Sequence, residues 1–123
     1  MIHLDTSFLI RAGVRGTAED HVLRRWRGKG TRIAISAIAW AEYLCGPLSK
    51  QAVESAAELL GEPRAFDALD ATLAAHLFNA SGRRRGTLPD CMIAAIAMNA
   101  QAPLATSNRA DFERFTSVGL VLA

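Results

Sequence analysis

Cysteine, lysine and long apolar runs are all scarce in this 123-residue sequence. Its two cysteines, Cys45 and Cys91, lack the paired spacing of a zinc site. We expect both to be reduced and buried, although one disulfide between them stays open. No apolar stretch approaches the roughly 20 residues that a membrane-spanning helix requires, and no basic segment precedes an apolar one at the start. A disulfide scaffold, a zinc module and a membrane protein are therefore disfavoured, and a cytoplasmic protein is expected.

The shortage of lysine is matched by an excess of arginine, with twelve Arg against two Lys and a net charge of only +2. One arginine-rich cluster surrounds Trp26, and a second is the run Arg83, Arg84 and Arg85. Guanidinium groups bind phosphate in a bidentate fork and stack on bases, so such clusters are candidates for contact with nucleic acid. A solvated helix face explains short basic runs equally well. Both interpretations stay open, with the second run as the candidate RNA contact.

The pattern of apolar runs and breakers predicts one α/β domain over residues 1–123. Half of the residues are hydrophobic, which is enough for a well-filled core. Strands separated by helices predict a mainly parallel sheet covered on both faces, and ligands bind at the carboxyl ends of such strands. The predicted strands are 2–5, 31–36, a short one within 64–69, 103–106 and 119–122; the predicted helices begin near 7 and then cover 19–28, 37–45, 50–60, 70–82 and 87–100.

Two acidic residues follow predicted strands. Asp5 comes directly after an apolar run, and Asp111 lies in the polar stretch "ATSNRADFERF" after strand 103–106. Each has a simpler explanation: Asp5 as the N-cap of the next helix, and Asp111 as a surface acid on a short helix capped by Asn108. Taken one at a time, these explanations are as good as a functional role.

Two further acidic residues lie in apolar helices. Glu42 is placed inside "AIAWAEYLCG", where an ionised carboxylate needs a partner because unpaired desolvation is costly. A salt bridge to an arginine would satisfy it. Asp90 lies in "GTLPDCMIAAIAMNA", where Thr87 as a cap, Pro89 in the first turn and an acid near the positive helix end all indicate a helix start. The helix that follows is apolar nearly all round, so it must be buried with its start at the edge of the sheet.

The combination of these four residues favours a catalytic site. In a doubly wound sheet, Asp5, Glu42, Asp90 and Asp111 can converge at one edge. Neighbouring carboxylates repel one another unless a cation is present, and Mg²⁺ or Mn²⁺ prefers such oxygen ligands. One or two such ions activate water and stabilise the leaving oxygen of a phosphodiester. The histidines are scattered and form no softer ligand set.

Three segments together resemble a known family. The opening "LDTSFLI", the segment "SAIAWAEYLCG" and the block "LPDCMIAAIAMNAQAPLATSNRADFERF" are similar, in order and spacing, to the motifs of PIN domains and specifically of VapC-type toxin ribonucleases. The similarity runs from residue 2 to about residue 115 and finds no acidic position missing. Residues 47–86 carry no motif of the family.

The resemblance implies a three-layer α/β/α fold with a five-stranded, mainly parallel sheet. It implies a Mg²⁺- or Mn²⁺-dependent endoribonuclease of a type II toxin–antitoxin pair, acting on RNA as a homodimer and blocked by a cognate VapB-type antitoxin. By position, Asp5, Asp90 and Asp111 would be the direct metal ligands, and Glu42 would act through water or orient the nucleophile. The supporting polar positions would be Thr6, Ser107 and Asn108.

Two other functions compete with this one. A non-catalytic RNA-binding or protein-interaction module of the same fold would use the arginines without metal chemistry. An aspartate-based phosphotransfer protein, either a haloacid-dehalogenase-like phosphatase or a receiver domain, fits less well. The phosphatase would have a second Asp where Ser7 stands, and both would have a lysine late in the chain, where this chain has only Lys29 and Lys50. The RNA target is not specified by the sequence.

Overall fold

A parallel sheet of three short strands forms the centre of the fold, in the order β2-β1-β3. The computed structural model describes residues 1–123. The strands are β1 (Ile2–Leu4), β2 (Ile33–Ile35) and β3 (Leu104–Ala105). In the register of the sheet, Leu4 lies between Ile35 on one side and Ala105 on the other. β1 therefore occupies the central position, and the residue after it lies at the middle of the sheet edge.

The expected five strands appear as three strands with one isolated bridge at each edge. These bridges are parallel and join Ser36 to Arg64 and Leu104 to Leu122. The segment at Arg64 is short because Pro63, which has no N–H, precedes it and α5 starts soon after it. The last segment follows Gly119, whose φ is 123°, and pairs through one residue pair only. The outer positions of the predicted sheet are thus present without forming full strands.

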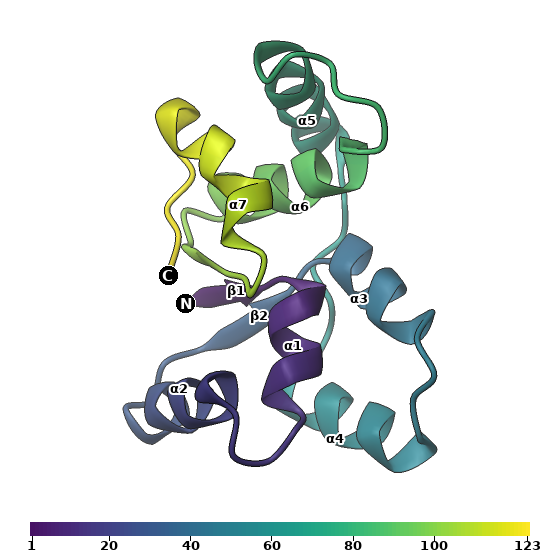
Figure 1. Cartoon of the computed structure of the whole chain (residues 1–123), viewed down its shortest axis with the longest axis vertical. Helices are drawn as coiled ribbons and strands as arrows, with labels where there is room; N and C mark the ends of the chain where they lie inside the picture. Colours follow the sequence, from purple (N-terminus) through teal and green to yellow (C-terminus); the bar gives the residue numbers. More distant parts are fainter.

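Helices cover both faces of the sheet, as expected for three layers. Figure 1 shows α5, α6 and α7 on one side of β1 and β2, with α1, α2 and α4 on the other. None of the helices is both long and apolar enough to cross a bilayer. The helices are α1 (Thr6–Ala12), α2 (Ala18–Gly28), α3 (Ala37–Leu44), α4 (Lys50–Leu60), α5 (Ala68–Ala80), α6 (Leu88–Asn99) and α7 (Arg109–Phe112), followed by the 3₁₀ helix η1 (Glu113–Val118).

The apolar helix α6 is the most deeply buried helix of the domain. Its residues from Ile93 to Ala97 are at most 1% exposed. Its alanines let neighbouring elements pack closely, as small residues do at helix contacts. On α5, Leu77 is buried, whereas Leu69 in the first turn is 75% exposed. Burial of α6 carries its first turn to the carboxyl edge of the sheet.

The two cysteines are both free thiols, as expected, but only one of them is buried. Cys91 lies inside α6 and has no exposed surface. Cys45 is exposed, which corrects the expectation that both would be buried. It occupies the C-cap of α3, where the chain turns outward toward Gly46 and Pro47.

Candidate active site

A pocket of about 270 Å³ opens at the carboxyl ends of β1 and β3. All four predicted acidic side chains contribute to its wall, and they come from the ends of β1 and from α3, α6 and α7. Ser107, the remaining predicted polar position, lies outside the wall and donates its backbone N–H to one wall residue, Ser7. The predicted members of the wall are Asp5, Glu42, Asp90, Asp111, Thr6 and Asn108.

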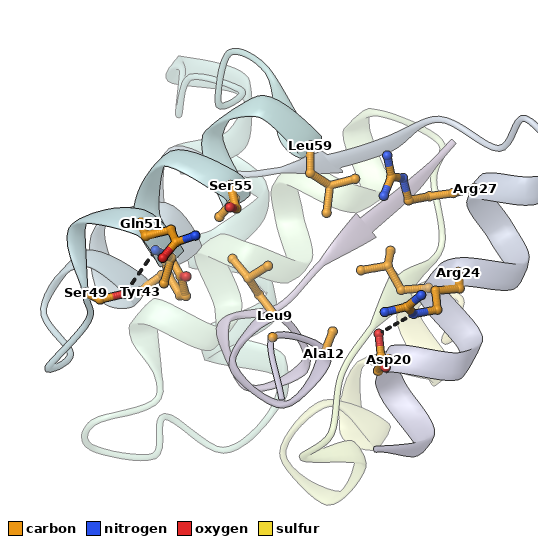
Figure 2. A pocket seen from close by; sticks show the side chains of 14 residues that line it. Leu9, Ala12, Asp20, Arg24, Arg27, Tyr43, Ser49, Gln51, Ser55 and Leu59 are labelled. Carbon is orange, nitrogen blue, oxygen red and sulfur yellow. Dashed lines mark hydrogen bonds and ion pairs between the residues drawn. The ribbon is translucent and has the colours of Figure 1, made fainter. Parts of the chain in front are cut away.

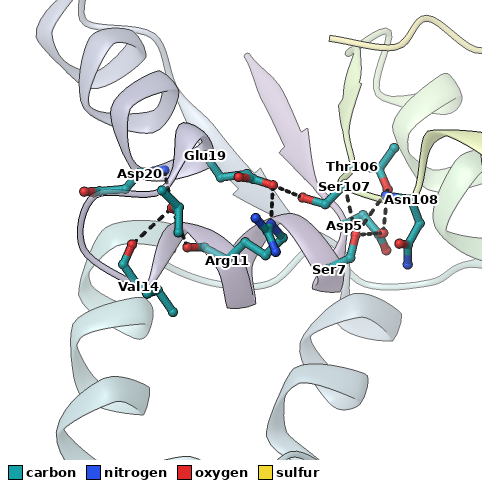
Figure 3. Close-up of polar contacts among 10 residues, drawn as sticks. Asp5, Ser7, Arg11, Val14, Glu19, Asp20, Thr106, Ser107 and Asn108 are labelled. Atoms are coloured by element: carbon teal, nitrogen blue, oxygen red, sulfur yellow. Dashed lines mark hydrogen bonds and ion pairs between the residues drawn. The ribbon is translucent and has the colours of Figure 1, made fainter.

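Asp5 is 5% exposed and is held by two hydroxyl groups. Its backbone occupies the N-cap position of α1, but its side chain makes no capping hydrogen bond, so the capping explanation of this carboxylate is wrong. Instead, the Ser7 Oγ and the Thr106 Oγ1 each donate to Asp5 Oδ2 at 2.8 Å (Figure 3). No protein donor reaches Asp5 Oδ1, which leaves that oxygen free to act as a ligand.

The loop after β3 orients the two hydroxyls. The backbone N–H of Ser107 donates to Ser7 Oγ at 3.1 Å, and the backbone N–H of Asn108 donates to Thr106 Oγ1 at 3.0 Å. Because each oxygen accepts one of these hydrogens, the hydroxyl's own hydrogen is available to Asp5. Thr106 is absent from the predicted site, although the parallel register that pairs Leu4 with Ala105 places it beside Asp5.

Glu42 lies at the mouth of the pocket, on α3. We expected it to face inward from an apolar helix, but its side chain is exposed, and its bonded neighbour is Thr6 in the first turn of α1. Thr6 Oγ1 lies 3.2 Å from Glu42 Oε1 and 2.9 Å from the carbonyl oxygen of Ala39, so one hydroxyl joins α1 to α3. Partial desolvation against the pocket wall raises the pKa of Glu42. The hydrogen bond from Thr6 opposes this rise in pKa, and the charge of Asp5 adds to it.

Asp90 is the acid whose proton equilibrium the site changes most. It lies in the first turn of α6, and its pKa is raised to about 6, chiefly by burial and then by the charges of Asp5 and Asp111. The guanidinium of Arg114, 3.8 Å away, lowers the pKa only in part. Arg114 is a further neighbour that sequence reasoning missed. Thr87 does not cap α6 as predicted, since its hydroxyl donates to the carbonyl of Arg84.

Asp111 and Asn108 reach the pocket from α7 and from the residue before it. Asp111 is exposed, and Asn108 occupies the N-cap position of α7 without a side-chain capping bond. The capping explanation of Asn108 is therefore wrong. Both side chains line the pocket instead.

The donor set of the pocket fits a hard divalent cation. Hard cations take carboxylate oxygens, and after burial the charges of Asp5 and Asp111 are the next causes that raise the pKa of Asp90, so the acids of this pocket act on one another. No group of three or more His, Cys, Asp or Glu side chains is yet arranged to hold an ion. Mutual repulsion keeps carboxylates apart until a cation screens them, so the residues fit the ion chemically and would have to close on it.

A comparison with protein-family models identifies the family. The model described as the PIN domain matches residues 2–117. The chain belongs to the PIN domain family. The match spans all four acidic positions of the pocket, and the sequence has no significant match among curated proteins.

Solved structures share the whole PIN fold with this chain. VapBC2 from Rickettsia felis, bound to a DNA fragment from its promoter, is 25% identical, with a TM-score of 0.77 over 100% of this chain and 98% of that one. DNA-bound VapBC from Salmonella typhimurium is 23% identical, with a TM-score of 0.78 over 99% and 96%. VapC20 from Mycobacterium tuberculosis, a toxin that cleaves the sarcin-ricin loop, is 18% identical, with a TM-score of 0.68 over 100% and 98%. These likenesses confirm the predicted fold class.

The PIN domain has a second and larger hollow, a groove of about 570 Å³ between α1, α2 and α4 (Figure 2). Leu9, Leu23 and Leu59 contribute apolar surface, and Arg24 and Arg27 contribute charge. The one acidic residue of the groove, Asp20, already forms a salt bridge with Arg24 at 2.9 Å. The groove therefore has the character of a binding surface, and the chemistry lies in the smaller pocket.

Proposed function

We propose that this PIN domain is a metal-dependent endoribonuclease, the toxin of a toxin–antitoxin pair. The observation that carries the proposal is one pocket lined by four carboxylates from four separate segments of the chain. Several carboxylates in one pocket are the typical setting for divalent-cation hydrolysis of phosphodiesters. The fold shared with a toxin that cleaves the sarcin-ricin loop supports RNA as the substrate.

Asp5, Asp90 and Asp111 would hold the cation, which would be Mg²⁺ or Mn²⁺. When bound, such an ion supplies Lewis-acid activation of water and stabilisation of the leaving oxygen. Asp5 is preorganised for this role, because its Oδ2 is fixed by two hydroxyls and its Oδ1 is free. Glu42, at the mouth with a raised pKa, is placed to accept the proton of the attacking water. The water oxygen would bond to phosphorus as the bond from phosphorus to the leaving oxygen breaks, and Glu42 would pass the proton on to that leaving oxygen.

The run Arg83, Arg84 and Arg85 is the proposed contact with the RNA backbone. All three side chains are exposed, and none belongs to a salt bridge in the protein. The run lies in the loop that leads into α6, shortly before Asp90. Exposed guanidinium groups without an acidic partner are suited to bind the phosphates of an RNA backbone.

The groove between α1, α2 and α4 is the proposed docking site of the antitoxin. Similar structures were solved as VapBC complexes, which supports such a partner. Leucine side chains in the groove favour an apolar segment, and Arg27, which forms no salt bridge in the protein, favours an acidic residue beside it. Helix α1 borders the groove and also carries Thr6 and Ser7 of the pocket, so an occupant of the groove would contact a helix that forms part of the catalytic pocket.

An RNA cleavage assay with purified protein tests the function. We expect cleavage in Mg²⁺ or Mn²⁺, no cleavage in EDTA, and a loss of about 100-fold or more in Asp5→Asn and Asp90→Asn. Glu54→Gln is the matched control, because this exposed carboxylate on α4 is 66% exposed and pairs only with Lys50.

Two outcomes would contradict the proposal. Equal activity in wild type and both Asn variants would rule out the mechanism. Binding of RNA without any cleavage, across both metals, would favour the non-catalytic RNA-binding module instead.

A further inference from the structure

Glu19 is an acidic residue outside the pocket that belongs to none of the predicted sites. It lies in the first turn of α2, and its side chain is only 14% exposed. Its Oε2 accepts hydrogen bonds from Ser107 Oγ at 2.6 Å and from Arg11 Nε at 2.7 Å (Figure 3). Three segments thus meet at one carboxylate oxygen: the consecutive helices α1 and α2, and the loop after β3, in which Ser107 is 88 residues away from Glu19.

A continuous path of hydrogen bonds leads from this carboxylate to Asp5. The Ser107 side chain is bonded to Glu19, and its backbone N–H donates to Ser7 Oγ. Ser7 Oγ in turn donates to Asp5 Oδ2. The next residue of the loop supplies a second branch, because the N–H of Asn108 supports the other hydroxyl on Asp5. Movement of this loop would therefore disturb both hydroxyls at once.

The bond to Ser107 is the more important of the two that Glu19 accepts. Arg11 is 58% exposed, and an ion pair with such an exposed partner contributes little to stability. A hydroxyl that donates to an ionised, shielded carboxylate at 2.6 Å is a short, charge-assisted bond. This bond is also the main reason that the pKa of Glu19 lies below its usual value, so the carboxylate is ionised at neutral pH.

We propose that Glu19 is a positioning residue that holds the loop at Ser107 and thereby fixes the carboxylate of Asp5 toward the pocket. Its effect on cleavage rests on the proposed nuclease function, whereas its effect on the loop does not. Asp5 Oδ1 would then face a bound cation in one orientation only. Without Glu19, the loop and Ser7 would gain freedom, and Asp5 would sample orientations in which it binds the ion poorly.

Three variants of the full-length protein separate positioning from simple stabilisation. Glu19→Ala removes both bonds, and Glu19→Gln keeps an oxygen that can accept from Ser107. Thr17→Ala is the matched control, because Thr17 is the N-cap of the same helix, accepting from the N–H of Asp20 at 3.1 Å, and does not contact the loop. It loosens the same end of α2 without breaking the path to Asp5.

The first measurement is the rate of amide hydrogen exchange at Ser107 and Asn108, recorded by NMR in the absence of metal and RNA. We expect exchange about fivefold faster or more in Glu19→Ala, close to wild type in Thr17→Ala, and partly restored in Glu19→Gln. Unchanged exchange in Glu19→Ala, or equally fast exchange in Thr17→Ala, would overturn the proposal.

The second measurement is the affinity for Mn²⁺, with kcat and KM for RNA cleavage beside it. Loss of a group that orients a metal ligand typically weakens binding by about tenfold or more, so we expect that loss in Glu19→Ala with lower kcat and little change in KM. If Glu19→Ala binds Mn²⁺ as tightly as the wild type, Glu19 does not position the carboxylate of Asp5. If the wild type neither binds Mn²⁺ nor cleaves RNA, the proposed function fails, and the exchange result still decides whether Glu19 holds the loop.

Discussion

Replacing Asp90 with asparagine should make the metal-free protein more stable at neutral pH while removing its activity. The pKa of Asp90 is about 6 in the fold, against an ordinary value of 3.8. The folded state therefore binds more protons than the unfolded state between these two values. Stability falls as pH rises through this window. Above the window, the ionised carboxylate lowers the free energy of unfolding by a constant amount, and asparagine removes this loss.

The size of the effect follows from the shift. A difference of this size corresponds to at most about 3 kcal/mol at pH 7, about 1.6 kcal/mol at pH 5 and about 0.5 kcal/mol at pH 4. The Asp90 side chain is 30% exposed, so solvent screening reduces these values, and we expect a gain of about 1–3 kcal/mol at pH 7. The ion pair with Arg114 opposes the gain, and the net shift of the pKa already contains that contribution.

Urea unfolding in EDTA at pH 7.5, 5 and 4 tests this reasoning. Asp90→Asn should have the higher midpoint at pH 7.5, and the difference should shrink steadily toward pH 4. Added Mg²⁺ should stabilise the wild type by mass action and the variant much less. Glu54→Gln, a change at an exposed carboxylate, should stay within about 0.5 kcal/mol of the wild type throughout. A variant that is less stable than the wild type at pH 7.5, or a difference that does not depend on pH, would refute the argument.

Four further measurements follow. Burial lowers the pKa of His3 from 6.5 to about 4, so the wild type should lose about 2 kcal/mol of stability relative to His3→Leu between pH 7 and pH 5. Neutralising Arg83–Arg85 should weaken RNA binding and flatten its dependence on salt. If the dependence of RNA affinity on salt is unchanged, these arginines are a solvated surface that does not contact RNA. Leu59→Glu in the groove should weaken binding of the antitoxin, with cleavage unaffected. Sedimentation at micromolar concentration should show a dimer, and a monomer would contradict the expected homodimer.

Most of the fold was predictable because local signals and the overall pattern agree. Apolar periodicity placed the helices, and helix breakers such as Gly61 placed their ends; α4 was predicted with the bounds that the structure has. The sheet edges were less predictable. A strand is defined by its partner, and at Arg64 and Leu122 the partner offers one residue pair rather than a ladder.

The acidic residues of the site were predictable from one topological rule. Parallel strands end at a common edge, so acids that follow strands or open buried helices converge there. The groups that hold these acids were not predictable in the same way. Ser7, Thr106 and Arg114 act through side-chain directions that depend on packing. Of Thr6 and Ser7, the sequence favoured Thr6 as the supporting residue for the site, yet only Ser7 bonds to Asp5.

Helical geometry explains how the two neighbouring hydroxyls divide their roles. Successive residues of a helix point about 100° apart, so Thr6 and Ser7, both in the first turn of α1, cannot address the same group. Thr6 faces α3 and bonds to Glu42, while Ser7 faces the loop after β3 and bonds to Asp5. The N-terminal turn of α1 thereby connects two carboxylates that approach the pocket from different elements. A rotation of α1 would move both hydroxyls, so the geometry of both carboxylates depends on how this short helix packs.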